Sequence, residues 1–323
     1  MTTGKLEPFA HETNPGDALR VAIETGDTAA AAALLGGHPD LRGRLDDALP
    51  GGAFGATPLL AAVGRGDRAM VDVLLGAGAG INARSHWWAG SFGVLDIEHG
   101  LNDFLIERGA TVDVHVAARL DMLERLDELV CADPGCVHAR GGDGQLPLHF
   151  SASVRIAAYL LDRGAEIDAR DVDHESTAAQ WMVKDRPEVA RYLVSRGCRT
   201  DILMAAVLGD LELVRHHLDA DPASIHTAVS DRYFPKANPR SGGSIYIYTL
   251  GTNRTPHQLA RAAGHDDVVR LLMDRSPPGL QFTQSCPHCR HGKRQCIAGP
   301  ESGHDRRAVR CGTRFDRERG HGQ

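Results

Sequence analysis

Short apolar stretches with helical spacing recur along the chain, and each ends at a glycine. In the four clearest copies, apolar residues at positions i, i+3 and i+4 lead into a Leu-Leu pair or its equivalent, then Gly, then Asn or Asp. These copies occupy residues 70–84, 104–114, 157–170 and 190–202. Apolar positions three and four residues apart predict an amphipathic helix. Glycine ends such a helix readily because it adopts the left-handed conformation.

A second, shorter helical stretch precedes these copies and begins near a proline. It is clearest at residues 56–67, 145–153 and 254–273. Proline is favoured at the first helical position because its missing N–H would be unpaired there. Each unit is therefore predicted to be a pair of short antiparallel helices followed by an extended turn. Stacked units bury their apolar stripes, at about 1.5–3 kcal/mol per fully buried Leu or Val, and form a solenoid in which each unit contacts only its neighbours.

These residues resemble the ankyrin repeat, whose hallmark is Thr-Pro-Leu-His-x-Ala at a period of about 33 residues. Parts of the hallmark stand at residues 57–60 (TPLL), 146–149 (LPLH) and 255–258 (TPHQ). Gly164 and Gly197, which end two of the helical stretches, are 33 residues apart. No copy of the hallmark is complete, but several incomplete copies at a shared spacing are more specific than one perfect copy.

The resemblance covers residues 17–276, as about eight units with an insertion at 227–252. The units start near Asp17, Gly55, Trp88, Val114, Gly144, Ser176, Ile202 and Asn253. The resemblance implies an all-α solenoid of stacked helix-turn-helix units. It further implies a non-enzymatic module or scaffold that binds another protein through its concave face and hairpin tips. Residues 1–16 are then a flexible arm, and residues 277–323 are a basic, disordered tail.

The repeat is first interrupted at residues 85–100, where a turn and a first helix are due. This segment instead gathers Trp87, Trp88 and Phe92. In one interpretation the rings fill a gap that an irregular helix leaves. In the other, a tryptophan is exposed on the concave face as an anchor, because Trp and Tyr dominate the energetics of protein interfaces.

The second interruption, residues 227–252, lacks helical periodicity. Ile and Tyr alternate at residues 245–248, which is the period-two pattern of a β-strand. Gly-Gly at 242–243 is a turn signal, and residues 232–234 are the candidate partner strand. We therefore predict a projecting β-hairpin that enlarges the binding face, with a purely structural flap over the neighbouring repeat as the alternative.

The two interruptions together supply the predicted partner-binding side chains. These are Trp87, Trp88, Tyr233, Phe234, Tyr246 and Tyr248. Their predicted role is rigid apolar anchoring with a polar rim.

No motif in the chain predicts catalysis. Ser91 lacks the glycine two positions before it, where Ala89 stands, and the strand-turn-helix context of a nucleophile elbow. The glycines of residues 76–80 follow a helix and serve as its stop, so they are no dinucleotide loop. Residues 171–175 (DVDHE) group several ligand-type side chains, which we interpret as a solvated hairpin tip, with a weak cation site as the alternative. We assign no catalytic, cofactor-binding or metal-binding residue.

Charge, hydropathy and cysteine content indicate which partners and which compartment to expect. Residues 1–280 carry a net charge of −11, which repels nucleic-acid phosphates. There is no apolar run of about 18 residues, so we expect no membrane span. The seven cysteines are an odd number, and residues 1–20 lack the apolar core of a secretory signal. We expect a monomeric, cytoplasmic protein without a bound cofactor.

Residues 281–323 differ from the rest of the chain, with a net charge of +5. Cys286 and Cys289 have the spacing of a zinc half-site, but no convincing second half-site follows. Three interpretations stay open: a disordered basic extension, a small zinc knuckle, and an out-of-frame continuation of the gene. The alternative function is therefore a zinc- or nucleic-acid-binding activity of this tail, with the repeats as scaffold.

Overall fold

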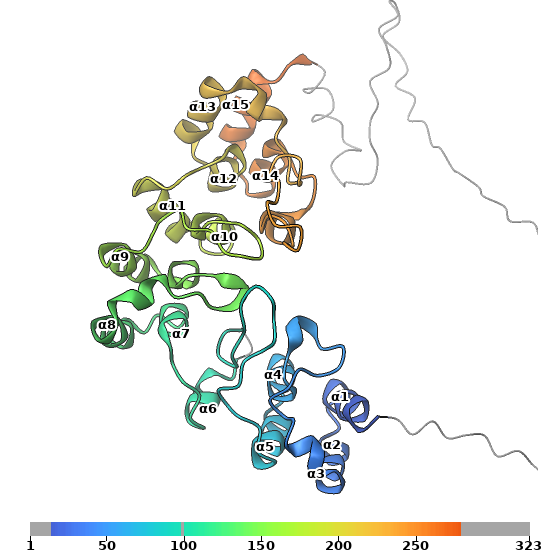
Figure 1. Cartoon of the computed structure of the whole chain (residues 1–323). Helices are drawn as coiled ribbons and strands as arrows, with labels where there is room; N and C mark the ends of the chain where they lie inside the picture. The colour runs from blue at the N-terminus through green and yellow to red at the C-terminus, as the bar shows by residue number, and fades with distance from the viewer. Residues whose placement is uncertain (1–13, 98–99, 279–323) are drawn as a thin grey trace, which may run out of the picture.

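Paired short helices stack side by side into a crescent (Figure 1). This computed structural model of the chain describes residues 14–97 and 100–278. Within these ranges the secondary structure is helical, and the only β-type pairing is an isolated bridge between Arg170 and Thr177. The predicted all-α solenoid is thus confirmed. The tail from residue 279 and the first 13 residues of the predicted arm lie outside the described ranges.

The helices form two layers. The inner layer, toward the open side of the crescent, consists of α1 (Pro15–Thr25), α4 (Pro58–Gly64), α7 (Val114–Arg119), η4 (Pro147–Phe150), α10 (Ala178–Met182), α12 (Ile202–Leu208) and α14 (Pro256–Ala262). The outer layer consists of α2 (Thr28–Gly37), α5 (Arg68–Gly76), α8 (Leu123–Ala132), α9 (Val154–Asp162), α11 (Pro187–Ser195), α13 (Leu211–Ala220) and α15 (Asp266–Arg275). Each inner element contacts the outer helix that follows it, as α4 contacts α5 and α12 contacts α13.

Shorter elements complete the chain. They are α3 (Pro39–Arg42), α6 (Asn102–Ile106), η1 (Ala53–Gly55), η2 (Pro134–His138), η3 (Gly142–Gly144), η5 (Pro222–His226) and η6 (Ile247–Gly251). None of the described helices is long and apolar enough to cross a bilayer.

Local sequence signals set the helix ends as the repeat predicts. Pro58 begins α4, and the Thr57 hydroxyl accepts a hydrogen bond from the Leu60 N–H at 3.2 Å. This bond pairs one of the N–H groups that a helix start leaves free. After α9, Gly164 has φ +92°, a backbone conformation that costs glycine little and other residues more.

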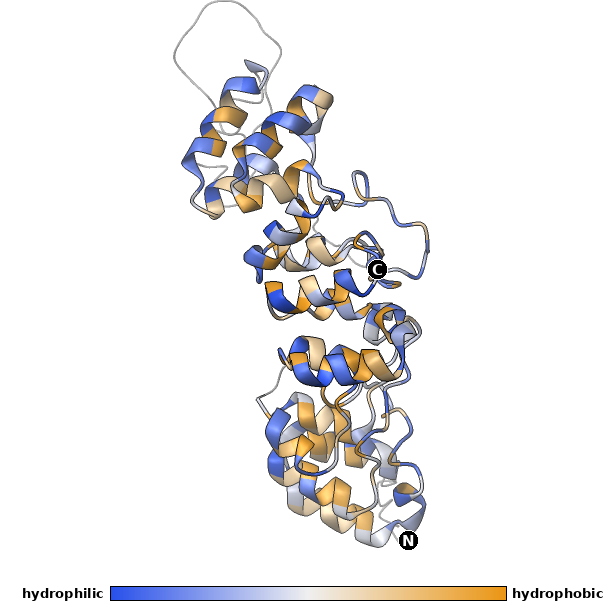
Figure 2. Cartoon of the chain, turned by 90° about the vertical axis from the view of Figure 1, so that its left-hand side faces the viewer, coloured by the Kyte–Doolittle hydropathy of each residue, from blue (hydrophilic) through white to orange (hydrophobic). Residues whose placement is uncertain are grey.

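The apolar residues lie on the faces that neighbouring helices share, shown in orange in Figure 2. They form two separate buried clusters rather than one. The first runs from Leu19 to Val116, and the second from Val114 to Leu272. The division falls at α7, where Val116 belongs to the first cluster and Val114 to the second. It follows the irregular segment 85–97, where the inner layer would have a helix.

The predicted β-hairpin at residues 227–252 is wrong. Ile245 and Tyr246 are both buried (3% and 0% exposed), so the side chains do not alternate between two faces. Residues 247–251 form the π-helical turn η6, and the Ile247 N–H donates to the carbonyl of Ser244, three residues back. Residues 230–234 form a local turn instead of a partner strand. Contacts with neighbouring units override the local β-pattern.

Candidate partner-binding surface

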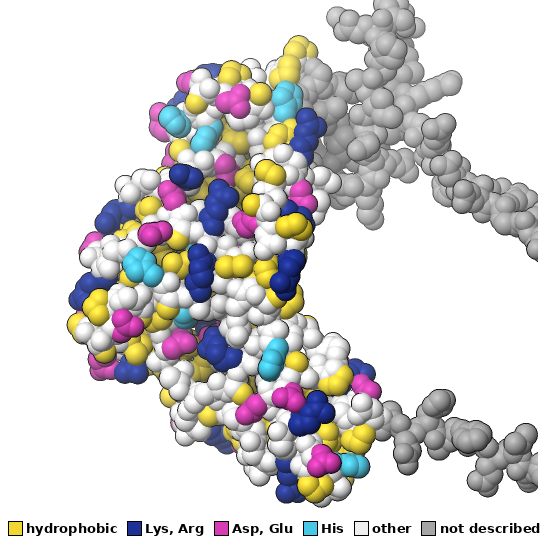
Figure 3. Space-filling model, viewed as in Figure 1, with side chains coloured by type: hydrophobic (Ala, Val, Ile, Leu, Met, Phe, Trp, Pro, Cys, Tyr) yellow, Lys and Arg dark blue, Asp and Glu magenta, His cyan; other side chains and the backbone are white. Residues whose placement is uncertain are grey.

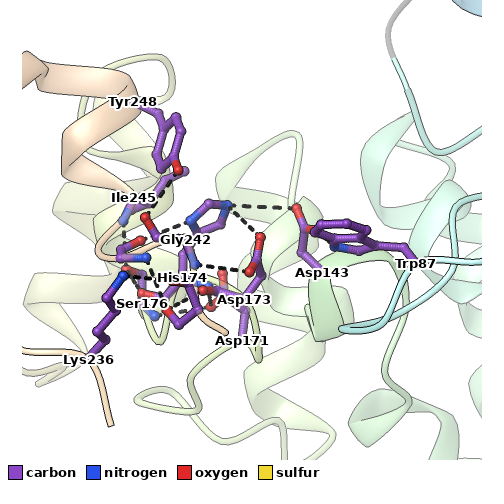
Figure 4. A network of polar contacts seen from close by, with 12 residues as sticks. Trp87, Asp143, Asp171, Asp173, His174, Ser176, Lys236, Gly242, Ile245 and Tyr248 are labelled. Carbon is purple, nitrogen blue, oxygen red and sulfur yellow. Dashed lines mark hydrogen bonds and ion pairs between the residues drawn. The ribbon is translucent and has the colours of Figure 1, made fainter. Parts of the chain in front are cut away.

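Both interruptions lie on the inner, open side of the crescent, the side that carries α10 and α14. They meet at the loops between repeat units (Figure 1). We define the tip surface as residues 85–97 and 227–252 together with the inter-unit loops 140–146 and 170–177. The indole N–H of Trp87 donates to Asp143 in the loop 140–146, and backbone groups of the insertion bond to the loop 170–177. Segments far apart in the sequence are therefore held in one surface (Figure 4).

The first interruption places both tryptophans on this surface. Trp87 and Trp88 are half-buried, with ring centres 6.1 Å apart. Trp87 also contacts Phe54 edge to face at 5.0 Å, and Phe54 is 52% exposed. Arg240 of the insertion lies over the Trp88 ring at 4.3 Å. The rings thus pack as fillers, as the first interpretation predicts, and they are not fully buried. Their role as partner anchors stays a prediction.

A glycine permits the close approach of the first interruption to the next loop. Gly90 has φ +151°, and a Cβ there would lie 2.1 Å from the carbonyl oxygen of Gly141. The Asp143 N–H donates to the Gly90 carbonyl at 3.3 Å. Only a residue without a side chain fits this backbone-to-backbone contact.

The insertion exposes Tyr248 and shelters two further aromatic residues. Tyr248 is 62% exposed, and its ring packs edge to face on His174 at 5.0 Å. Tyr233 and Phe234 are half-buried and line a cleft of about 240 Å³ together with Lys236. These three aromatic residues stay in the predicted binding set.

Tyr246 does not belong to that set, because no part of its side chain is accessible. Its hydroxyl donates to the Oδ2 of Asp201 at 3.0 Å, and its ring packs on Phe234 at 5.4 Å. Ile245 lies in the same apolar cluster. Ile245 and Tyr246 therefore act as the alternative prediction described, as part of a structural flap that packs over the neighbouring repeat.

Side chains of the loop 170–177 hold the insertion in place. The Glu175 carboxylate accepts hydrogen bonds from the N–H groups of Ala237 and Asn238, both at 2.7 Å. The Ser241 hydroxyl donates to the Asp173 carbonyl at 2.5 Å, and the Gly242 N–H donates to the same oxygen at 3.0 Å. These bonds fix the position of the insertion against the repeat.

The same loop is more buried than the sequence predicted. Asp171 is 4% exposed and Asp173 is 5% exposed, so the interpretation of residues 171–175 as a solvated tip is wrong. Burial raises the pKa of Asp171 to about 6, although hydrogen bonds from the Ser176 N–H and the Trp181 indole oppose the shift. Burial likewise raises the pKa of Asp143, opposed by the nearby His174.

Exposed cations surround the aromatic rings. They are Arg140, Arg170, Lys184, Arg232, Lys236 and Arg240. Arg170 and Lys236 line the cleft beside Tyr233, and Arg232 lies over the Tyr233 ring at 5.4 Å. Figure 3 shows Lys and Arg side chains, in dark blue, along the middle of the crescent. The tip surface also holds six Asp/Glu residues and is not basic overall. Asp143, Asp171 and Asp173 are buried, however, so cations predominate among its exposed charges.

Sequence reasoning missed three members of this surface, which are Asp143, His174 as a packed ring, and Arg240, and it missed Phe54, which packs against the surface from outside it. A signal for one pair was available. Asp143 and His174 are 31 residues apart, close to one repeat period, so equivalent loops of neighbouring units bring them together. Phe54 and Arg240 have no comparable signal, because their positions depend on the irregular segments.

Two segments match the family model of the ankyrin repeat, residues 54–86 and 143–172. The first contains α4 and α5 and ends directly before Trp87. The second contains η4 and α9 and ends directly before Asp173. No curated protein matches the chain. The regular helix pairs thus follow the family pattern, whereas much of the tip surface lies just outside the matched segments.

Proposed function

Because this chain is an ankyrin-repeat protein, we propose that it binds another protein through the tip surface and carries out no chemistry there. Ankyrin repeats generally mediate protein–protein interaction. The observation that carries the proposal is the set of accessible aromatic rings on loops that hydrogen bonds hold in place. Rings that are fixed before binding lose little conformational entropy when a partner covers them.

The partner surface that fits best is acidic with an apolar anchor. Trp88 and Tyr248 offer apolar area, and Arg240 and Lys236 offer charge beside it. An acidic residue of the partner would pair with these cations while its apolar neighbour covers the rings. The acidic remainder of the chain would repel such a partner elsewhere, which favours docking at this one place.

We further propose that the protein acts as a monomer in the cytoplasm. The cysteines in the described ranges, Cys131, Cys136 and Cys198, are free thiols. Free thiols are usual in a reducing compartment.

The test is affinity capture from the source cells with the full chain as bait. We compare the wild type with Trp88→Ala and Tyr248→Ala. Tyr192→Ala is the matched control, because Tyr192 also pairs with an arginine, Arg196 at 5.5 Å, but lies on the outer helix α11. Loss of a central aromatic anchor costs about 2 kcal/mol or more.

We expect a partner that the wild type and the control retain and that both tip variants recover at least about tenfold less. We also expect the partner to elute as salt rises, because the cations are exposed. Equal recovery by all four proteins would show that the tip surface is not the binding site.

A further inference from the structure

Three potential metal ligands converge at the centre of the tip surface. The carboxylates of Asp143 and Asp173 and the imidazole of His174 each offer one ligand atom, and these atoms all lie within 4.8 Å of one another (Figure 4). The His174 Nε2 is 3.9 Å from the Asp143 Oδ2 and 3.7 Å from the Asp173 Oδ2. We propose that these three side chains bind a divalent transition-metal ion of the zinc class.

A hydrogen bond at the Nδ1 atom of His174 leaves the Nε2 atom as the nitrogen that can offer a lone pair to an ion. The Nδ1 atom is 3.0 Å from the carbonyl oxygen of Gly243. A carbonyl oxygen only accepts, so Nδ1 carries the proton. In the neutral tautomer with this proton, Nε2 offers its lone pair beside two carboxylate oxygens, which is a donor arrangement suited to a cation. Ligating histidines commonly donate their other N–H to a backbone carbonyl.

Each carboxylate is also held by its other oxygen. The Asp143 Oδ1 accepts a hydrogen bond from the Trp87 indole N–H at 2.9 Å. The Asp173 Oδ1 accepts one from the Gly242 N–H at 3.1 Å. Within the described part of the chain, the two Oδ2 atoms accept no hydrogen bond. The outer atoms are thus used for orientation, and the inner atoms are left for a ligand.

Burial and spacing both fit a metal ion. The side chains of Asp143, Asp173 and His174 are 12%, 8% and 11% exposed. At metal–ligand distances of about 2.0–2.2 Å, two ligands of one ion lie roughly 3–4 Å apart. The observed nitrogen–oxygen separations fall in that range and exceed the length of a hydrogen bond. A direct imidazolium–carboxylate pair would be closer.

The donor set selects the class of ion. Imidazole with carboxylates suits Zn²⁺ and its first-row neighbours, whereas Ca²⁺ and Mg²⁺ prefer oxygen ligands alone. Three protein ligands leave a coordination position for water or for a group of a partner. The ion would join two inter-unit loops, and through Trp87 and Gly242 it would tighten both interruptions against them. This site does not depend on the proposed protein recognition.

The chain carries its own optical reporters of this site. Its three tryptophans are Trp87, Trp88 and Trp181. Trp87 donates to Asp143, and the Trp181 ring is 5.2 Å from the His174 ring. A paramagnetic substitute ion such as Co²⁺ bound between Asp143 and His174 would quench this fluorescence.

The experiment uses the full chain, stripped of metal with a chelator and titrated with Zn²⁺ by calorimetry and with Co²⁺ by tryptophan fluorescence. We expect binding of one ion per chain at this site. Asp143→Asn and Asp173→Asn are expected to weaken it at least about tenfold, and Trp87→Phe, which removes an outer-shell donor, about tenfold. The matched control Asp231→Asn removes an exposed carboxylate of the insertion, 4.0 Å from Lys236, and should bind as the wild type does.

A second control separates this site from the cysteine-rich tail. The double variant Cys286→Ser with Cys289→Ser should retain Co²⁺ quenching and the affinity that the aspartate variants lose. The proposal is overturned if the aspartate variants, folded by circular dichroism, bind as the wild type does. It is equally overturned if the tail variant alone abolishes binding. Absence of Zn²⁺ and Co²⁺ binding even at millimolar concentration would likewise overturn it.

Discussion

Replacing Tyr246 by phenylalanine removes one buried hydroxyl and nothing else from the insertion. That hydroxyl donates to the Asp201 Oδ2 at 3.0 Å. Asp201 also caps α12, because its Oδ1 accepts from the Met204 N–H at 2.9 Å. Its Oδ2 has one further partner, the Gln180 amide at 3.4 Å. The bond from Tyr246 therefore links the insertion to the start of an inner helix.

The structure sets the size of the effect. A hydrogen bond to a charged group contributes about 1.5–3 kcal/mol, and the remaining acceptor is left partly unpaired. Burial already raises the pKa of Asp201, while the bond from Tyr246 lowers it, so removing the bond makes the buried charge less favourable still. We expect Tyr246→Phe to lower the free energy of unfolding by about 2 kcal/mol. The matched variant Tyr248→Phe loses a bond to the Gly242 carbonyl at an exposed site, and should change it by less than about 0.5 kcal/mol.

Urea unfolding followed by circular dichroism measures both values, with the slope against urea concentration unchanged. A Tyr246→Phe variant as stable as the wild type would refute the reasoning, because Asp201 would then be satisfied without the phenol. Equal losses in the two variants would also refute it, since burial would no longer distinguish the two tyrosines.

Two further outcomes follow from backbone geometry and from a buried imidazole. Gly90→Ala should destabilise the protein by about 3 kcal/mol and shift tryptophan emission, because its Cβ would strike Gly141. Gly109→Ala, at φ +92° with open space around it, should cost only about 1 kcal/mol; similar melting shifts for both would contradict the steric argument. His149 donates to the Ser176 carbonyl at 3.1 Å, and burial lowers its pKa to about 4. The unfolded chain then takes up this proton first as pH falls, so stability should decrease by on the order of 3 kcal/mol from about pH 6.5 to about pH 4. Urea unfolding across that range should show a flatter profile for His149→Asn, and an unchanged slope would exclude His149 as the cause.

The repeat pattern predicted the helix pairs because their signals are local. Pro58 after a capping threonine, and Gly164 at a positive φ, act within a few residues of themselves. The conformation of residues 245–248 could not be predicted in this way. Their alternation favours a strand in isolation, but the Ile245 N–H bonds to the Ser176 hydroxyl, 69 residues away in sequence. Long-range partners of this kind leave no periodic trace.

The residues of the candidate site show the same difference between local signals and long-range packing. Trp87, Trp88 and Tyr248 could be selected from composition alone, because aromatic residues are rare in this chain. Tyr246 could not be separated from Tyr248, since only packing decides which of two nearby tyrosines is covered. The nearness of Asp143 to His174 follows from the repeat period, once equivalent loops are aligned.

The division of the apolar core into two clusters has a consequence for how the protein unfolds. Each cluster can melt as its own cooperative block, since side chains from Leu19 to Val116 and those from Val114 to Leu272 pack largely among themselves. The blocks communicate through the α6–α7 junction, where Val112 packs against both clusters, and through the polar bridge from Trp87 to Asp143. A ligand or substitution that strengthens the hydrogen bond from Trp87 to Asp143 would couple the two clusters, so that their two unfolding transitions merge into one.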